Sequence, residues 1–167
     1  ELYKVFYIHT MNRSIIIHAG LPRTATTTLQ KTLFPKYCRH PLYTKDGMSS
    51  ILAKNEYHLL RKLNDGQKLK NSEIARIIFT AATLTYDIED KWFSTLLKAI
   101  EKLLKNKQTF DLPPLLSSEG LTLTVASYNI RGSEAGRQFG VIPLIKAVNK
   151  ITNEPPKIVI CFRDPIE

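Results

Sequence analysis

The sequence predicts an α/β fold in which a parallel β-sheet is flanked by helices. Three short apolar segments, at 14–19, 115–118 and 157–162, have the length and composition of buried parallel strands. Longer amphipathic segments separate them, as the crossovers between parallel strands require. The 167 residues suit one domain that can bury a core without a disulfide scaffold or structural metal.

The first half of the chain begins with the best-defined strand. The elements predicted there are, in order, a 1–13 N-terminal extension, strand 14–19 ending at Gly20, helix 26–37, helix 48–63, turn 64–66 and a helix capped by Ser72. Pro35 is predicted to end the first helix early, because proline has no N–H to donate. The segment 14–167 is predicted to form the domain.

The second half contains the strongest helical pattern, over 87–107. Its apolar residues follow the 3.6-residue period, and acidic residues at its start and lysines at its end complement the helix dipole. Strand 115–118 follows, then a helix over 133–152 that Pro143 is expected to interrupt. Strand 157–162 is predicted to be a third buried strand.

Positive charge is concentrated in the first half of the chain. The net charge is +9, and the first 84 residues hold 13 basic but only 5 acidic residues. Such a field favours an anionic partner, whether nucleic acid, an acidic polymer or a phosphorylated small molecule. The chain has no apolar run long enough to span a membrane and no CxxC pair. We therefore expect a cytoplasmic protein with no membrane span and no metal.

The segment from Gly20 to Thr28 has the composition of a phosphate cradle. A tight turn between a strand and a helix points several backbone N–H groups at one place. Four threonines add hydroxyl donors, and Arg23 adds a permanent charge with a planar donor fork. The loop is not a Walker A motif, because Ala25 and Thr26 stand where that motif has Gly and Lys.

This segment resembles the 5′-phosphosulfate loop of sulfotransferases that use 3′-phosphoadenosine 5′-phosphosulfate (PAPS). The family loop, Pro-Lys-(Thr/Ser)-Gly-Thr-Thr, aligns with Pro22-Arg23-Thr24-Ala25-Thr26-Thr27. Arg163-Asp164-Pro165 resembles the motif that ends the strand before the family's 3′-phosphate site. Ser117-Ser118-Glu119 and Thr28-Leu29-Gln30 resemble bacterial members.

The resemblance implies a P-loop-like fold and a PAPS-dependent sulfuryl transfer to a hydroxyl acceptor, with carbohydrate as one candidate class. Arg23 then contacts the sulfonate or the leaving phosphate oxygen, and Arg163 binds the 3′-phosphate. The group that holds the 5′-phosphate comprises Pro22, Arg23, Thr24, Ala25, Thr26, Thr27 and Thr28. Glu119 is the first candidate for the general base, against the alternative of a simple turn carboxylate. His18 is expected to be a core histidine.

The chain departs from the family pattern at three places. Arg23 replaces lysine, which keeps the charge but cannot donate a proton to the leaving group. Ala25 replaces the loop glycine, so a Cβ has to be accommodated. The family also has a serine shortly after the second motif, at a position beyond Glu167. The resemblance thus implies the amino-terminal portion of a sulfotransferase, truncated on the C-terminal side, with an open sheet edge prone to association.

Two other functions remain open at this point. A P-loop kinase or NTPase is disfavoured by the missing Walker lysine, and Asp164 would have to bind its metal. A non-catalytic polyanion binder is favoured by the charge, with Arg61, Lys62, Lys68 and Lys70 as one basic cluster. No known DNA-binding motif accompanies that cluster, so nucleic acid is not expected as a partner.

Overall fold

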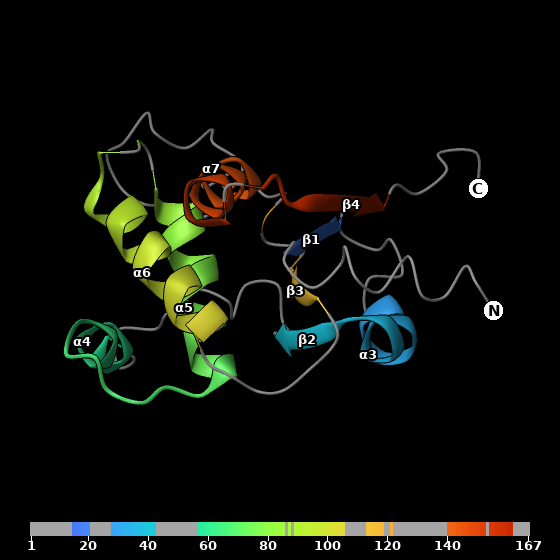
Figure 1. Cartoon of the computed structure of the whole chain (residues 1–167), viewed down its shortest axis with the longest axis horizontal. Coiled ribbons are helices and arrows are strands. Elements are labelled where there is room, and N and C mark those ends of the chain that lie inside the picture. The colour runs from blue at the N-terminus through green and yellow to red at the C-terminus, as the bar shows by residue number, and fades with distance from the viewer. Residues whose placement is uncertain are drawn as a thin grey trace, which may run out of the picture.

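The computed structural model describes residues 15–20, 28–42, 57–85, 87, 89–105, 113–118, 121, 140–152 and 154–161. Within these ranges the chain is a mixed α/β structure in which helices flank a parallel sheet (Figure 1), which confirms the predicted class. The elements are β1 Ile16–Gly20, the π-helix η1 Leu29–Leu33, α3 Phe34–Tyr37, β2 Arg39–Leu42, α4 His58–Asn64, α5 Asn71–Leu84, α6 Lys91–Lys105, β3 Pro114–Ser117, α7 Val141–Thr152 and β4 Lys157–Cys161.

The sheet has the strand order β2-β3-β1-β4, and every pairing is parallel. β1 lies between β3 and β4 in unbroken register, which places the three predicted strands side by side. β2 was not predicted, and it joins β3 with a register shift between Arg39 and Leu42. Its Pro41 cannot donate a ladder hydrogen bond, which suits a strand at the edge of the sheet.

Helix α5 forms the centre of the hydrophobic core. It packs against α6, α7 and β2, and α6 and α7 also contact each other. Figure 1 shows these three helices together on one side of the sheet, with α3 on the other side beside β2. The predicted apolar residues of α5 are all buried, namely Ala75, Ile78, Phe79 and Ala82. Several polar or additional apolar positions of this helix are buried too, so it has neighbours on more than one face.

Helix boundaries differ from the prediction where a carboxylate supplies the cap. Glu73 Oε2 accepts a hydrogen bond from the backbone N–H of Lys70 at 2.6 Å, and α5 begins at Asn71. The prediction that Ser72 caps this helix is therefore wrong. Helix α6 begins at Lys91 because Asp90 Oδ1 accepts from the backbone N–H of Trp92 at 2.9 Å.

Two prolines lie inside helical segments that were predicted to break there. The helix does not end at Pro35, since α3 continues to Tyr37. The preceding π-helical turn, in which the Phe34 N–H donates to the Leu29 carbonyl, widens the chain just before Pro35. Pro143 lies in the first turn of α7, where an N–H has no intrahelical partner, so it does not interrupt that helix. The part of the predicted helix before Gly140 lies outside the described residues.

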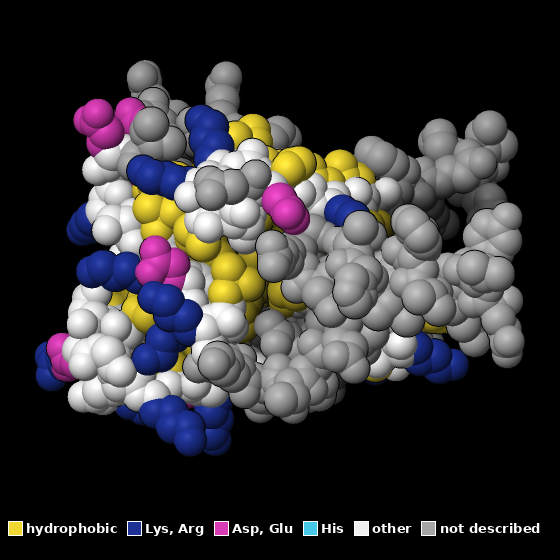
Figure 2. Space-filling model, viewed as in Figure 1, with side chains coloured by type: hydrophobic (Ala, Val, Ile, Leu, Met, Phe, Trp, Pro, Cys, Tyr) yellow, Lys and Arg dark blue, Asp and Glu magenta, His cyan; other side chains and the backbone are white. Residues whose placement is uncertain are grey.

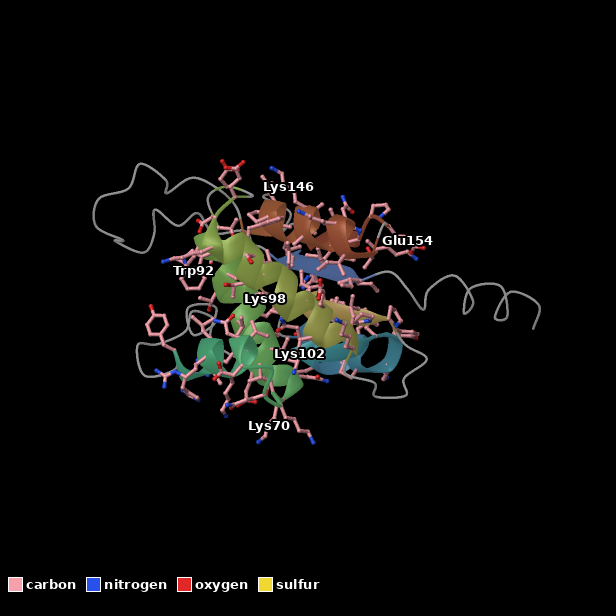
Figure 3. The ribbon with its side chains drawn as sticks, turned by 60° about the vertical axis from the view of Figure 1, so that its left-hand side comes forward. Lys70, Trp92, Lys98, Lys102, Lys146 and Glu154 are labelled. Atoms are coloured by element: carbon pink, nitrogen blue, oxygen red, sulfur yellow. The ribbon has the colours of Figure 1, made fainter. Side chains whose placement is uncertain are left out.

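Two lysines of α6 form hydrogen bonds with the turn after α4. The confirmed turn at 64–66 uses the left-handed conformation of Gly66, whose φ is 69°. Lys102 Nζ donates to the Gly66 carbonyl at 3.1 Å, and Lys98 Nζ donates to Asn64 Oδ1 at 3.4 Å. Figure 3 shows both lysines on α6. The helix predicted over 48–63 is confirmed from His58 onward, and residues 48–56 lie outside the described residues.

Strand β4 is formed as predicted, but its predicted burial is wrong. Ile158, Val159 and Ile160 are 45%, 38% and 47% exposed. Because consecutive strand residues point to opposite faces, neither face of β4 is fully covered. Figure 2 shows hydrophobic side chains at the surface over α7 and β4. The apolar composition of β4 therefore predicts a strand correctly but does not predict its position at the edge of the sheet.

Candidate functional site

The carboxyl ends of three parallel strands meet at one edge of the sheet. Gly20 at the end of β1 is the register partner of Cys161 at the end of β4. His18 of β1 is the register partner of Ser117 at the end of β3. Ligand sites of open α/β sheets lie at this edge, outside the carboxyl ends of the strands. The candidate site therefore belongs at the ends of β3, β1 and β4.

Most of the residues predicted to bind a ligand lie outside the described residues. These are Pro22, Arg23, Thr24, Ala25, Thr26, Thr27, Glu119 and Arg163. Thr28 is described, and it lies exposed at the start of the helical segment that includes η1 and α3. Its carbonyl accepts a hydrogen bond from Thr32 Oγ1 at 2.7 Å. Its predicted phosphate contact stays a prediction.

A buried polar cluster lies at the same edge of the sheet and involves three elements. Gln30 Nε2 donates to Ser117 Oγ at 2.7 Å, and Ser117 Oγ is 2.8 Å from His18 Nδ1. The exposed fractions of Gln30, Ser117 and His18 are 6%, 0% and 0%. The helical segment, β3 and β1 are thus joined through one hydroxyl group. We call these three residues the buried polar cluster.

His18 is the core histidine that the sequence predicted. The ring of Phe34 contacts its imidazole edge-on, with the ring centroids 5.0 Å apart. The carbonyl of His18 accepts a hydrogen bond from the backbone N–H of Ser118 at 3.1 Å. The Ser118 hydrogen bond extends the contact between β1 and β3 by one residue beyond Ser117, and the Phe34 ring joins α3 to β1.

Ser117 and His18 have the atom types of a nucleophile and its base, but their environment does not suit that chemistry. A serine nucleophile has to reach its substrate, and Ser117 has no exposed surface. Its oxygen also receives the Gln30 amide, which stabilises electron density on Oγ rather than releasing it for attack. The buried polar cluster is therefore better suited to holding backbone elements in place than to attacking a substrate.

In the sequence, Gln30 and Ser117 stand out only as parts of motifs, and their contact was not predicted. One signal was present in the sequence. Ser117 ends an apolar strand that was predicted to be buried, and a buried hydroxyl requires a hydrogen-bond partner. The identity of that partner could not be read from the pattern, because Gln30 lies 87 positions away.

Other candidate groups lie away from this edge. No group of three or more His, Cys, Asp or Glu side chains that could hold a metal ion is present in the part of the chain that the structure describes. Burial raises the pKa of the Cys38 thiol above its ordinary value, which lowers its reactivity at neutral pH. Arg61, Lys68 and Lys70 are exposed on α4 and the segment after it, and Figure 2 shows basic side chains spread over the helical part of the visible face.

The comparisons with known proteins leave the family open. No protein-family model, no curated protein and no solved structure matches this chain. Within the described ranges, no helix has the length and apolar character needed to cross a membrane. The function of this chain therefore has to be inferred from its motifs and from the geometry of the sheet edge.

Proposed function

We propose that this chain is a PAPS-dependent sulfotransferase domain that transfers a sulfuryl group to a hydroxyl acceptor. The observation that carries the proposal is the adjacency of β1 and β4, with Gly20 and Cys161 as register partners. The phosphosulfate-type motif begins two positions after Gly20, and Arg163 comes two positions after Cys161. A donor with phosphates at both its 5′ and 3′ ends requires two anion-binding segments that start close together.

The residues of the two motifs would divide the work of holding this donor. Thr24, Thr26, Thr27 and Thr28 offer hydroxyl donors for the 5′-phosphate, together with backbone N–H groups of the loop. Arg163 offers a bidentate fork for the 3′-phosphate. The Ala25 methyl group is compatible with this arrangement where its φ is negative.

The reaction is an in-line displacement at sulfur. The bond from sulfur to the bridging phosphate oxygen breaks as a bond to the acceptor oxygen forms, and adenosine 3′,5′-bisphosphate leaves. By analogy with phosphoryl transfer, the protein contributes positioning and charge neutralisation. Arg23 would neutralise charge on the sulfonate or leaving oxygen, and Glu119 would accept the acceptor's hydroxyl proton. Because arginine stays protonated, the leaving group has to depart without a proton from residue 23.

The alternatives predict different ligands. A P-loop kinase or NTPase would bind ATP with magnesium, whereas a polyanion-binding domain would bind acidic polymers through residues such as Arg61. The basic surface is compatible with an acidic carbohydrate acceptor as well, so polyanion binding alone does not separate it from the sulfotransferase. Binding of adenosine 3′,5′-bisphosphate, compared with binding of ATP and magnesium, does separate the sulfotransferase from the alternatives.

The test is thermal unfolding with and without adenosine 3′,5′-bisphosphate. A ligand at a hundredfold excess over its Kd stabilises the native state by about 2.7 kcal/mol, which raises the midpoint. We expect this rise for the wild type, a smaller rise for Arg23→Ala and Arg163→Ala, and an unchanged rise for the control Arg61→Ala on α4. An equal rise with ATP and magnesium that depends on Asp164 favours the kinase or NTPase. No rise with either nucleotide would contradict the proposed function.

A further inference from the structure

We infer that Gln30, Ser117 and His18 are positioning residues that hold both flanks of segment 21–27 to the end of β3. This inference rests on the proposed function, in which that segment binds the 5′-phosphosulfate. Its basis is the buried polar cluster, where one hydroxyl contacts a side chain on each flank. His18 precedes the segment by three positions and Gln30 follows it by three.

The chemistry of the three side chains bears on which atom donates in each hydrogen bond of the cluster. Within the described part of the chain, Ser117 Oγ contacts two side-chain partners, Gln30 and His18. A hydroxyl has one proton and two lone pairs, and an amide nitrogen can only donate. Gln30 therefore donates to Ser117 Oγ. The contact with His18 can run in either direction, because a neutral imidazole nitrogen donates or accepts according to its tautomer. We assign the tautomer in which Ser117 donates to His18 Nδ1 and the imidazole proton lies on Nε2, and nitrogen-15 chemical shifts test that assignment.

The cluster joins the residues on either side of segment 21–27 rather than the helices of the core. Ser117 ends β3, the strand next to β1, and the Ser118 N–H bonds the His18 carbonyl at 3.1 Å. Phe34 packs its ring on His18 at 5.0 Å, which gives the helical segment a second contact with β1. By contrast, α5, α6 and α7 pack against one another in the helical layer. We therefore expect loss of the Gln30 bond to weaken the attachment of η1 to β3 more than the packing of the helical layer.

The principal experiment measures the affinity for adenosine 3′,5′-bisphosphate by calorimetric titration. The variants are Gln30→Met, which keeps the side-chain length but cannot donate, and Ser117→Ala, which removes the shared hydroxyl. The control is Thr85→Val, which removes a buried hydroxyl that donates to the Ala81 carbonyl at 2.7 Å on α5. We expect roughly a tenfold rise in Kd for each cluster variant, the size associated with one buried hydrogen bond, and less than a twofold change for Thr85→Val.

A structural role alone makes a different prediction. The titrations are run well below the unfolding midpoint of every variant, so that each protein is fully folded. If the cluster residues affect only the overall stability, the titrations will give one of two results. Either the Kd is unchanged in every variant, or it rises as much in Thr85→Val as in Gln30→Met and Ser117→Ala. Either result overturns the inference while leaving the proposed function standing. Absence of binding by the wild type overturns both.

A second measurement, made without any nucleotide, tests the direction of the hydrogen bond between Ser117 and His18. Nitrogen-15 chemical shifts of the His18 ring separate the two neutral tautomers. We expect the Nε2–H tautomer in the wild type and loss of that single tautomer in Ser117→Ala. A wild-type His18 protonated at Nδ1 would overturn the inferred direction, and a tautomer unaffected by Ser117→Ala would show that the hydroxyl does not set it.

Discussion

Helix α5 and strand β4 have similarly apolar sequences but very different surroundings. Ile74, Ile77 and Ile78 of α5 are fully buried, whereas Ile158 and Ile160 of β4 are about half exposed. The helix has α6, α7 and β2 packed around it, while β4 pairs with β1 at one end of the strand order. Apolar composition therefore predicts which segments become ordered elements, and the number of packed neighbours decides how far each is buried.

The largest expected effect comes from making one substitution in both regions. Ile78→Ala should lower the free energy of unfolding by about 2–5 kcal/mol, since it removes buried methyl groups and leaves a cavity. Ile160→Ala should change it by less than about 1 kcal/mol, because the side chain is already half hydrated. Urea unfolding followed by fluorescence of Trp92, the single tryptophan, measures both values. Equal losses in the two variants would contradict the difference in burial.

The same contrast explains which parts of the fold the sequence could predict. The apolar run 14–19, with three consecutive isoleucines, predicts β1 because local composition favours extended structure there. The period of α6 likewise predicts Phe93, Leu96 and Ile100 on its buried side. The exposure of β4 depends instead on which elements lie beside it, which no local pattern contains.

The candidate site divides in the same way. The motifs at 22–27 and 163 could be recognised from short contiguous patterns, and their ligand contacts stay predictions because these residues lie outside the described ranges. The contact between His18 and Ser117 joins positions 99 apart, and it follows from the pairing of β1 with β3. Such a contact requires the sheet order, which the spacing of apolar runs does not determine.

An intermediate effect is expected where Gly140, the residue before α7, lies against Thr83 of α5. A Cβ built on Gly140 lies 3.1 Å from Thr83 Cγ2, a distance at which the neighbour has to move. Gly140→Ala should therefore cost about 1–3 kcal/mol of stability through overpacking. Thr83→Ser removes that methyl group and keeps the hydroxyl that donates to the Phe79 carbonyl at 2.9 Å.

The double variant Gly140→Ala with Thr83→Ser tests this explanation by urea unfolding. If the clash with Cγ2 causes the loss, the double variant should be more stable than the sum of the two single changes predicts. Strict additivity would mean that the Gly140→Ala loss has another origin. The helical layer would then be less tightly packed at this point than the comparison with β4 implies.

The smallest change in stability is expected where charge is added to β4. Ile158 and Ile160 share one face of the strand and are about half exposed, so Ile158→Lys with Ile160→Lys should together alter the free energy of unfolding by about 1 kcal/mol or less. Its effect on association should be much larger, because lysines on an edge strand discourage pairing with another chain.

Sedimentation velocity over a range of concentrations measures that association. The matched control adds two lysines at exposed helical positions, Ser94→Lys and Asn149→Lys, and so raises the net charge equally. We expect the β4 variant to associate less than both the wild type and this control. An equal reduction of association in the control would assign the effect to net charge. A wild type that stays monomeric at all concentrations would show that an exposed apolar strand does not by itself cause association. Only a reduction specific to β4 links its low burial to intermolecular pairing.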